Sequence, residues 1–164
     1  MSNEGWKVAN NTLVHERNTM AAMASAGETW SQLLEGARQV KRNGRTAIHD
    51  PLFRQRIAEL QIRIESMRLH AMRQLTNLIR GRAAGVESLV NKLAGTELSY
   101  DLANTAMALF GSYAMLGRDG HDPLDRGVWA QHLMLSCAYR IAGGTSLIQK
   151  NIIAERGLGM PRSR

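Results

Sequence analysis

The sequence is poor in the residues that build disulfide-linked or β-rich proteins. Its 164 residues include 1 Cys, 3 Pro and 5% aromatics, against 44% hydrophobic residues and 9 Met. A single Cys excludes an intrachain disulfide framework, and its apolar setting in LMLSCAYR predicts that Cys137 fills the core rather than acting as a nucleophile. The scarcity of aromatic residues favours helices over strands.

Segments that would anchor the chain or bind a metal are also missing. No apolar run approaches the ~18 residues of a membrane span, and no secretion signal opens the chain, so a cytoplasmic protein is expected. The five His form no HxxxH or HExxH pair, which predicts no metal site. Neither a P-loop nor a dinucleotide-binding glycine motif appears.

Basic residues exceed acidic ones by 21 to 14, for a net charge of +7. Such an excess suits nucleic acid, but equally a phosphorylated cofactor or substrate. The densest run, at residues 41–45, falls where a helical pattern breaks and carries no interleaved aromatic residues. A solvated helix end, where basic residues complement the helix dipole, is favoured over a nucleic-acid site.

Hydrophobic periodicity predicts five helices and little else. Apolar residues recur at helical spacing in segments that cover about residues 4–40, 50–81, 85–116, 125–142 and 146–156. Long amphipathic helices with short connections describe an all-α, up-and-down four-helix bundle with a short additional C-terminal helix. The whole chain, residues 1–164, is expected to form one domain.

Local signals mark where these helices begin, end and face. Asp50 followed by Pro51 supplies an N-cap acceptor and a proline at the first helical position. Gly81 ends that helix, and Gly95 could interrupt the next one. GRDGHDP, at residues 117–123, predicts a loop. An apolar stripe over roughly eight turns consists of Ile57, Leu60, Ile64, Met67, Ala71, Leu75 and Leu78.

One carboxylate stands out on the first predicted helix. Glu16 lies three residues after Leu13 and four before Met20, so it shares an apolar stripe with both. A carboxylate in that setting is costly unless it is paired or neutral. The pattern alone gives equal weight to a salt-bridged or edge position and to a general base whose pKa burial would raise.

Both ends of the chain resemble one enzyme family. GGTSLIQKNIIAERGLGMPR, at residues 143–162, resembles the C-terminal end of the acyl-CoA dehydrogenase family. NEGWKVANNTLVHER, at residues 3–17, resembles the start of that family's C-terminal helical domain, and DPLFRQRIAEL resembles the domain's second helix. The resemblance covers nearly the whole chain but only one of the family's three domains, the other two being an N-terminal helical domain and a middle β-domain.

The resemblance implies α,β-desaturation of an acyl-CoA thioester with FAD as cofactor. In the family a Glu removes the α-proton while the β-hydrogen leaves as hydride to the flavin. Some members place this Glu directly before the Gly-Thr of the terminal turn, where this chain has Gly143. Others carry it on the first helix in an L-x-x-E-R setting, which residues 13–17 reproduce. The resemblance therefore implies Glu16 as the catalytic base and Arg17 as its substrate-side neighbour.

Cofactor contacts carry over less completely. Gly144 and Thr145 match the Gly-Thr that lies against the flavin phosphates in the family, and amides that open a helix suit an anion. Gly111 persists from a Q-x-x-G-G stretch whose Gln is replaced by Ala108. By the same resemblance, Arg54 is the expected substitute for a polar residue near the adenine.

Two further positions depart from the family pattern. Leu147 stands where the family usually has Glu or Gln. The R-x-x-F-G segment, which reaches the FAD of a neighbouring subunit, is replaced by RNGRTAIHDPLF at residues 42–53. These departures imply either weakened FAD binding or a partner chain that supplies the missing contacts, as in mixed-subunit members of the family.

The resemblance predicts the C-terminal domain of an FAD-dependent acyl-CoA dehydrogenase, as a fragment of a larger enzyme or a truncated gene product. It would contribute the base, part of the FAD site and the oligomer interface, and would be inactive by itself. The expected partners are an acyl-CoA substrate, electron-transfer flavoprotein, and like or unlike subunits in a dimer or tetramer, with neither nucleic acid nor a membrane. The alternative is a non-catalytic helical oligomerisation or partner-binding module derived from that fold.

Overall fold

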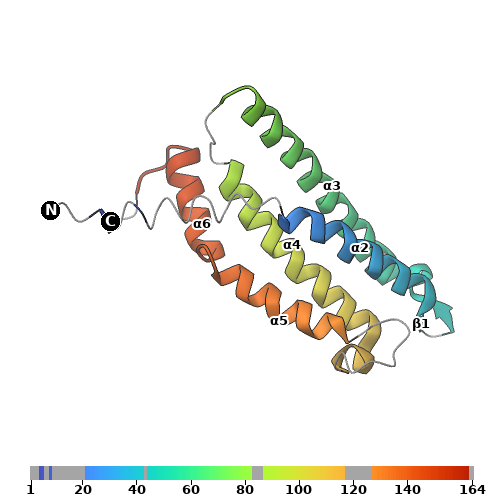
Figure 1. The fold of residues 1–164 in the computed structure, drawn as a ribbon. Helices are drawn as coiled ribbons and strands as arrows, with labels where there is room; N and C mark the ends of the chain where they lie inside the picture. The colour runs from blue at the N-terminus through green and yellow to red at the C-terminus, as the bar shows by residue number, and fades with distance from the viewer. Residues whose placement is uncertain are drawn as a thin grey trace.

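Four helices pack side by side, and a short fifth helix closes one end of the bundle (Figure 1). The computed structural model describes residues 4, 5, 8, 21–42, 44–82, 87–116 and 127–162. Its α-helices are α2 Ala21–Gln39, α3 Pro51–Ile79, α4 Glu87–Phe110, α5 Val128–Ile141 and α6 Ser146–Ile152. The predicted all-α, up-and-down bundle with a short C-terminal helix is confirmed. The predicted loop at residues 117–123 lies outside the described residues.

The start of α3 follows the sequence signal at Asp50. The Asp50 carboxylate accepts hydrogen bonds from the backbone N–H of Leu52 at 2.9 Å and of Phe53 at 3.4 Å, and Pro51 occupies the first turn. Two otherwise unpaired amides are thus satisfied, which stabilises a helix start by about 1 kcal/mol. The predicted N-cap is confirmed.

Helix α4 is the centre of the bundle. It packs against α2, α3 and α5 along its length and against α6 near its N-terminal end (Figure 1). The predicted interruption at Gly95 is wrong, because α4 is continuous there. A Cβ atom at Gly95 would lie 3.4 Å from the Met67 Cε of α3, so the glycine serves close packing between α3 and α4.

A small hairpin follows α2 where the sequence predicts a solvated basic helix end. Strands β1 Lys41–Arg42 and β2 Arg45–Thr46 pair antiparallel, and Gly44 adopts a left-handed φ of 80° at the turn. The 3₁₀-helix η1 Ala47–His49 then leads into α3. The basic run is therefore ordered against the bundle rather than being a simple helix end.

The core lies where α4 passes between α2, α3 and α5. Trp129 of α5 is 1% exposed, and its ring stacks on the Phe110 ring at the end of α4 with centroids 6.0 Å apart. Around this pair the buried apolar cluster consists of Leu33, Ala37, Ala47, Ile57, Leu60, Leu98, Leu102, Ala106, Leu109, Ala114 and Val128.

The predicted apolar stripe of α3 is buried in its first half only. Ile57 and Leu60 are buried and Ile64 is partly buried, but Leu75 and Leu78 are exposed. Helix α3 extends over about 44 Å at 1.5 Å per residue. Within the described chain, the apolar side chains of its second half are left uncovered.

The prediction that Cys137 fills the core is wrong. Its thiol is exposed on α5, one position after the buried Ser136. Successive helical residues point about 100° apart, so the face that carries Trp129 and Ser136 inward turns Cys137 outward.

Beyond α6 the backbone widens into a single π-helical turn, η3 Ile153–Gly157. The Leu158 N–H donates to the Ile153 carbonyl at 3.1 Å, the five-residue spacing that defines this turn. Within the described residues, the helices are too short or too polar to cross a lipid bilayer.

Gly36 gives the sharpest test of this packing. A Cβ atom there would lie 2.3 Å from the Phe110 Cζ, whereas a Cβ at Gly27, on the same helix, would meet nothing within 4 Å. We expect Gly36→Ala to lower the free energy of unfolding by about 1–3 kcal/mol through overpacking. Gly27→Ala should raise it by up to about 1 kcal/mol, because alanine favours the helix. Urea unfolding of both variants measures the difference, and equal effects would contradict the packing described.

Candidate functional site

The terminal turn, Gly143–Gly144–Thr145, connects α5 to α6 in a conformation that requires glycine. Gly143 has φ 64° and Gly144 has φ 107°, both in the left-handed region. Residues with a Cβ atom adopt this region at a cost of about 1–2 kcal/mol. Thr145 then caps α6, because its hydroxyl oxygen accepts from the Ile148 N–H at 3.4 Å.

Two side chains hold the carbonyl groups of the terminal turn. The Gln149 side chain is fully buried, and its Nε2 donates to the Gly143 oxygen at 2.8 Å and to the Gly144 oxygen at 3.4 Å. Lys92, near the start of α4, donates from Nζ to the same Gly144 oxygen at 2.5 Å. The turn is thus clamped from α4 on one side and from α6 on the other.

Glu97 lies further along α4 than Lys92 and connects the two helices, α5 and α6, that flank the terminal turn. Its carboxylate accepts from the Ser146 hydroxyl at the start of α6 and from Arg140 at the end of α5, with the Arg140 Nη2 at 3.0 Å. The Arg140 guanidinium also lies 4.5 Å from the centre of the Tyr100 ring. Charge-assisted hydrogen bonds of this kind are about twice as strong as neutral ones, so Glu97 fixes α5 and α6 on α4.

A second group of predicted site positions lies at the other end of α4. Arg42 of the hairpin donates from Nη1 to the Ala108 carbonyl oxygen, and its guanidinium carbon lies 4.7 Å from the centre of the Phe53 ring. One side chain therefore joins the hairpin, α3 and α4. Ala108 is the position where the resembled family carries Gln.

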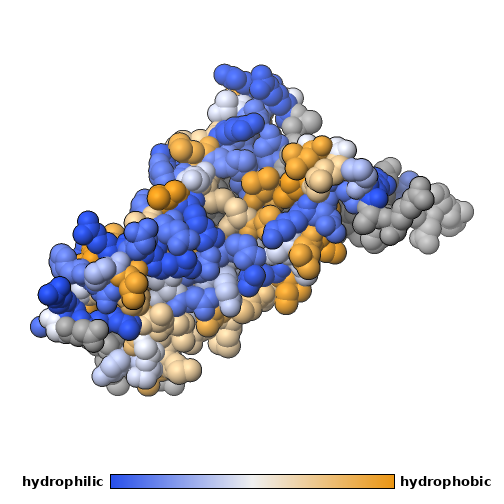
Figure 2. All heavy atoms as spheres, turned by 180° about the vertical axis from the view of Figure 1, so that it is seen from behind, coloured by the Kyte–Doolittle hydropathy of each residue, from blue (hydrophilic) through white to orange (hydrophobic). Residues whose placement is uncertain are grey.

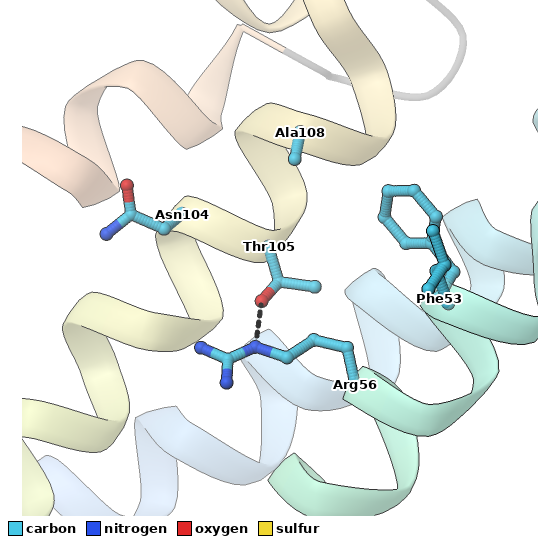
Figure 3. A pocket seen from close by; sticks show the side chains of 6 residues that line it. Phe53, Arg56, Asn104, Thr105 and Ala108 are labelled. Carbon is cyan, nitrogen blue, oxygen red and sulfur yellow. Dashed lines mark hydrogen bonds between the residues drawn. The ribbon is translucent and has the colours of Figure 1, made fainter.

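Below this contact, residues of α3 and α4 line an open surface depression of about 290 Å³ that we call the α3–α4 pocket. Figure 3 shows Arg56 of α3 reaching across to Thr105 of α4, where its Nε donates to the hydroxyl oxygen at 3.4 Å. The Arg56 Nη2 also pairs with Asp101 at 3.2 Å. The residues that line the pocket are Leu52, Phe53, Arg56, Asn104, Thr105 and Ala108.

The hairpin borders a second pocket, of about 310 Å³, that we call the hairpin pocket. Its lining is basic except for one carboxylate that the N-cap of α3 already uses: Arg42, Arg45, His49, Asp50 and Pro51. Guanidinium and imidazole groups around a small pocket suit a phosphate or another anion.

The structure brings some of the predicted site residues together and separates others. Gly144 and Thr145 are adjacent in the clamped terminal turn. Gly111, with φ 58°, opens the 3₁₀-helix η2 Gly111–Met115 after α4, and Arg54 is exposed in the first turn of α3. Along α4, Lys92, which holds the terminal turn, and Ala108, three residues before Gly111, are separated by a rise of roughly 24 Å. Residues at these two places cannot meet one small ligand group.

The two predicted catalytic residues, Glu16 and Arg17, lie outside the described residues. Their placement beside the terminal turn stays a prediction. Among the residues that the structure does describe, no group of three or more His, Cys, Asp or Glu side chains is arranged to hold a metal ion.

Sequence reasoning missed the residues that hold the terminal turn. Lys92 and Glu97 lie in a predicted helix with no motif around them, and Gln149 lies in the predicted short C-terminal helix. Arg42 belongs to the basic run that was interpreted as a helix end. The only available signal was the pair of glycines itself, since a double glycine in a left-handed turn needs side chains from elsewhere to fix it.

Comparison with known proteins gives the same family over nearly the whole chain as the sequence resemblance does. A family model described as "Acyl-CoA dehydrogenase, C-terminal domain" matches residues 3–158. Acyl-CoA dehydrogenase IpdE1 of Mycobacterium tuberculosis is 31% identical over 161 residues, which cover 97% of this chain and 39% of that protein. The chain therefore spans about two fifths of the length of this relative.

Solved structures give the same fold. The structure described as "Tcur3481-Tcur3483 steroid ACAD" superposes with a TM-score of 0.78 at 25% identity, covering 98% of this chain and 41% of that one. The ChsE4-ChsE5 complex from Mycobacterium tuberculosis superposes with a TM-score of 0.81 at 24% identity, covering 99% and 42%, and so supports the fold alone.

Gly144 gives the test of the terminal turn. A Cβ atom at this position would lie 2.8 Å from the buried Gln149 Nε2, whereas Gly81, also left-handed at φ 65°, has nothing within 4 Å. Both Gly→Ala variants carry the backbone cost of about 1–2 kcal/mol, but Gly144→Ala also displaces the clamp. We expect its loss of unfolding free energy to exceed that of Gly81→Ala by about 1 kcal/mol or more. Urea titrations with the same loss for both would count against the clamp.

Proposed function

This chain belongs to the acyl-CoA dehydrogenase family, whose C-terminal domain it matches, and we propose that it supplies this domain to an FAD-dependent acyl-CoA dehydrogenase. The observation that carries the proposal is the terminal turn. The stretch that most resembles the family contains this turn, and side chains donate hydrogen bonds to the carbonyl groups of both Gly143 and Gly144. The proposed reaction is α,β-desaturation of an acyl-CoA thioester.

The residues present fit FAD at two places. The terminal turn offers the Thr145 N–H, which the hydrogen bonds of the described chain leave unused, at the position the family places against the flavin phosphates. The hairpin pocket offers Arg42, Arg45 and His49 to a phosphate, and the family uses this region for the FAD of a neighbouring subunit. FAD, when bound, accepts the β-hydrogen as hydride. We propose that Gly111 and Arg54 belong to the second place.

Glu16 is the proposed catalytic base, with Arg17 as its substrate-side neighbour. Two observations support this role: the L-x-x-E-R setting at residues 13–17 and the glycine at position 143, where other members carry the base. The carboxylate would accept the proton from the α-carbon of the thioester, and electron-transfer flavoprotein would remove the electrons from the reduced enzyme.

The departures from the family support an assembly with a second kind of subunit. Arg42 donates to the Ala108 carbonyl oxygen, and its guanidinium lies over the Phe53 ring. Position 108 is alanine here, whereas the family has a glutamine side chain there. A partner chain could provide the missing polar contacts. Two similar structures carry the names of two chains, Tcur3481-Tcur3483 and ChsE4-ChsE5. Because the first is named a steroid ACAD, a steroid-derived acyl-CoA is the substrate class that we propose to test first.

Replacing the base tests the proposed reaction. In the complete protein that contains this chain, Glu16→Gln keeps the shape of the side chain but removes the proton acceptor. We expect turnover to fall about 10²–10⁴-fold, as for other general bases, with substrate binding much less affected. The matched control is Glu28→Gln, which changes an exposed carboxylate on α2 and should leave turnover unchanged.

Moving the base provides the rescue. Gly143→Glu in the Glu16→Gln background should restore part of the turnover, and only part, because position 143 is left-handed and disfavours a side chain. Near-normal turnover of Glu16→Gln alone would show that another carboxylate is the base. No turnover even in the unmodified protein would favour the non-catalytic module.

Self-association is the second prediction from family membership. The outer face of α5 exposes Met134, Leu135, Tyr139 and Ile141 around the exposed Cys137 thiol. On the rear of the molecule, hydrophobic atoms also gather toward the end that carries α6 (Figure 2). Apolar surface of this kind is typical of subunit contacts.

Two isoleucines provide matched variants for that prediction, since Ile141 on α5 and Ile62 on α3 are each 67% exposed. We expect light scattering to give an oligomer at tens of micromolar and Ile141→Asp to dissociate it, because the charge would be buried at the contact. Ile62→Asp should leave the oligomer intact. The only Cys in the chain, Cys137, should react faster with a thiol reagent in Ile141→Asp. A monomer in all three proteins would exclude the assembly.

A further inference from the structure

We propose that Lys92 is a positioning residue for the terminal turn, whose ammonium group fixes the Gly144 carbonyl and thereby the direction of the Thr145 N–H. The contact spans 52 positions in sequence and joins the first turns of α4 to the turn before α6. The inference rests on the proposed function only for the identity of the ligand, FAD. The ordering of the turn does not depend on that identity.

The geometry of the peptide group carries the argument. The Gly144 carbonyl and the Thr145 N–H belong to one planar trans peptide, so they point in opposite directions. The carbonyl points to Lys92 on α4. The Thr145 N–H therefore faces away from α4, and the hydrogen bonds of the described chain do not use it.

Gln149 supports the same orientation from the other side. Its buried Nε2 donates to both glycine carbonyls, and its Oε1 is buried without a partner in the described chain. Rotating the amide would place Oε1 against the Gly143 oxygen, two acceptors in contact, so the side chain is held in this orientation. The carbonyl groups of Gly143 and Gly144 thus both accept hydrogen bonds from side chains, those of Gln149 and Lys92.

Two consecutive glycines make this clamp necessary. Glycine has no side chain to restrict its backbone. The Gly144 N–H donates to the Ile141 carbonyl oxygen at 3.2 Å, and the two side-chain donors add to this backbone bond of the glycine pair by holding both carbonyl groups. Lys92 contributes more than a neutral donor would, because a hydrogen bond from a charged group is stronger. Its positive charge also lies beside the turn that is proposed to meet an anionic cofactor.

The experiment compares three variants of the complete protein that contains this chain. Lys92→Met keeps the length of the side chain and removes the donor. Lys92→Arg keeps a charged donor. Lys150→Met is the matched control, since it removes a positive charge from an exposed position on α6. Two quantities are measured: the affinity for added FAD, and hydrogen exchange of two turn amides, those of Gly144 and Gln149, which donate to the Ile141 and Thr145 carbonyl oxygens.

In Lys92→Met, we expect the turn amides to exchange about tenfold faster or more, and the Kd for FAD to rise by a similar factor. Lys92→Arg should restore both at least in part, and Lys150→Met should change neither. A role in general stability alone would lower the unfolding midpoint without recovery in Lys92→Arg, and that result would overturn the proposal. If Lys92→Met fails to fold, Lys92→Gln is measured in the same way.

Unchanged exchange of the Gly144 and Gln149 amides in a folded Lys92→Met would overturn the positioning role, whatever the FAD affinity. Faster exchange in a protein that binds no FAD would instead exclude the proposed flavin site and leave the positioning role supported. The failure of the inference and the failure of the proposed function are thus distinguishable.

Discussion

The position of the Phe110 ring is the constraint on which the arrangement of the bundle depends. On one side the ring fills the space left by Gly36 of α2, where a Cβ atom would lie 2.3 Å away. On the other side it stacks on Trp129 of α5, at an interplanar angle of 28°. One side chain at the end of α4 therefore sets how closely α2 and α5 approach that helix. Because interiors are close-packed, this distance cannot relax without cost.

A single helix then determines the spacing of the two candidate cofactor positions. Lys92 and Glu97 hold the terminal turn near the start of α4, whereas Ala108 receives Arg42 near its end. An uninterrupted helix is stiff, so the roughly 24 Å between these places is fixed. Glycine at position 95 keeps α3 close to α4 without bending it.

Sequence reasoning predicted what is local and missed what is distant. The cap at Asp50, the helical periodicity and the end of α3 at Gly81 depend on a few neighbouring residues, and all are found. The prediction for Cys137 failed because an apolar neighbourhood in sequence does not tell which face of a helix a residue takes. The clamp on the terminal turn was out of reach, since nothing near Lys92 in the sequence indicates a bond to a residue 52 positions away. The proposed catalytic pair, Glu16 and Arg17, lies outside the described residues, so the structure does not test it.

The backbone of the terminal turn is consistent with a base located elsewhere. Gly143 and Gly144 are both left-handed, and a glutamate at position 143 would pay about 1–2 kcal/mol for that conformation. A chain that keeps its base in this turn must therefore use a different backbone or accept strain. A chain that carries the base on another helix has no such conflict and can fix the turn through its carbonyl groups. The buried Gln149 and the amine of Lys92 donate to those carbonyl groups. The only side chain of the turn beyond a hydrogen is that of Thr145, and its hydroxyl oxygen already caps α6. The conformation of the turn and the proposed location of the base thus depend on the same pair of glycines.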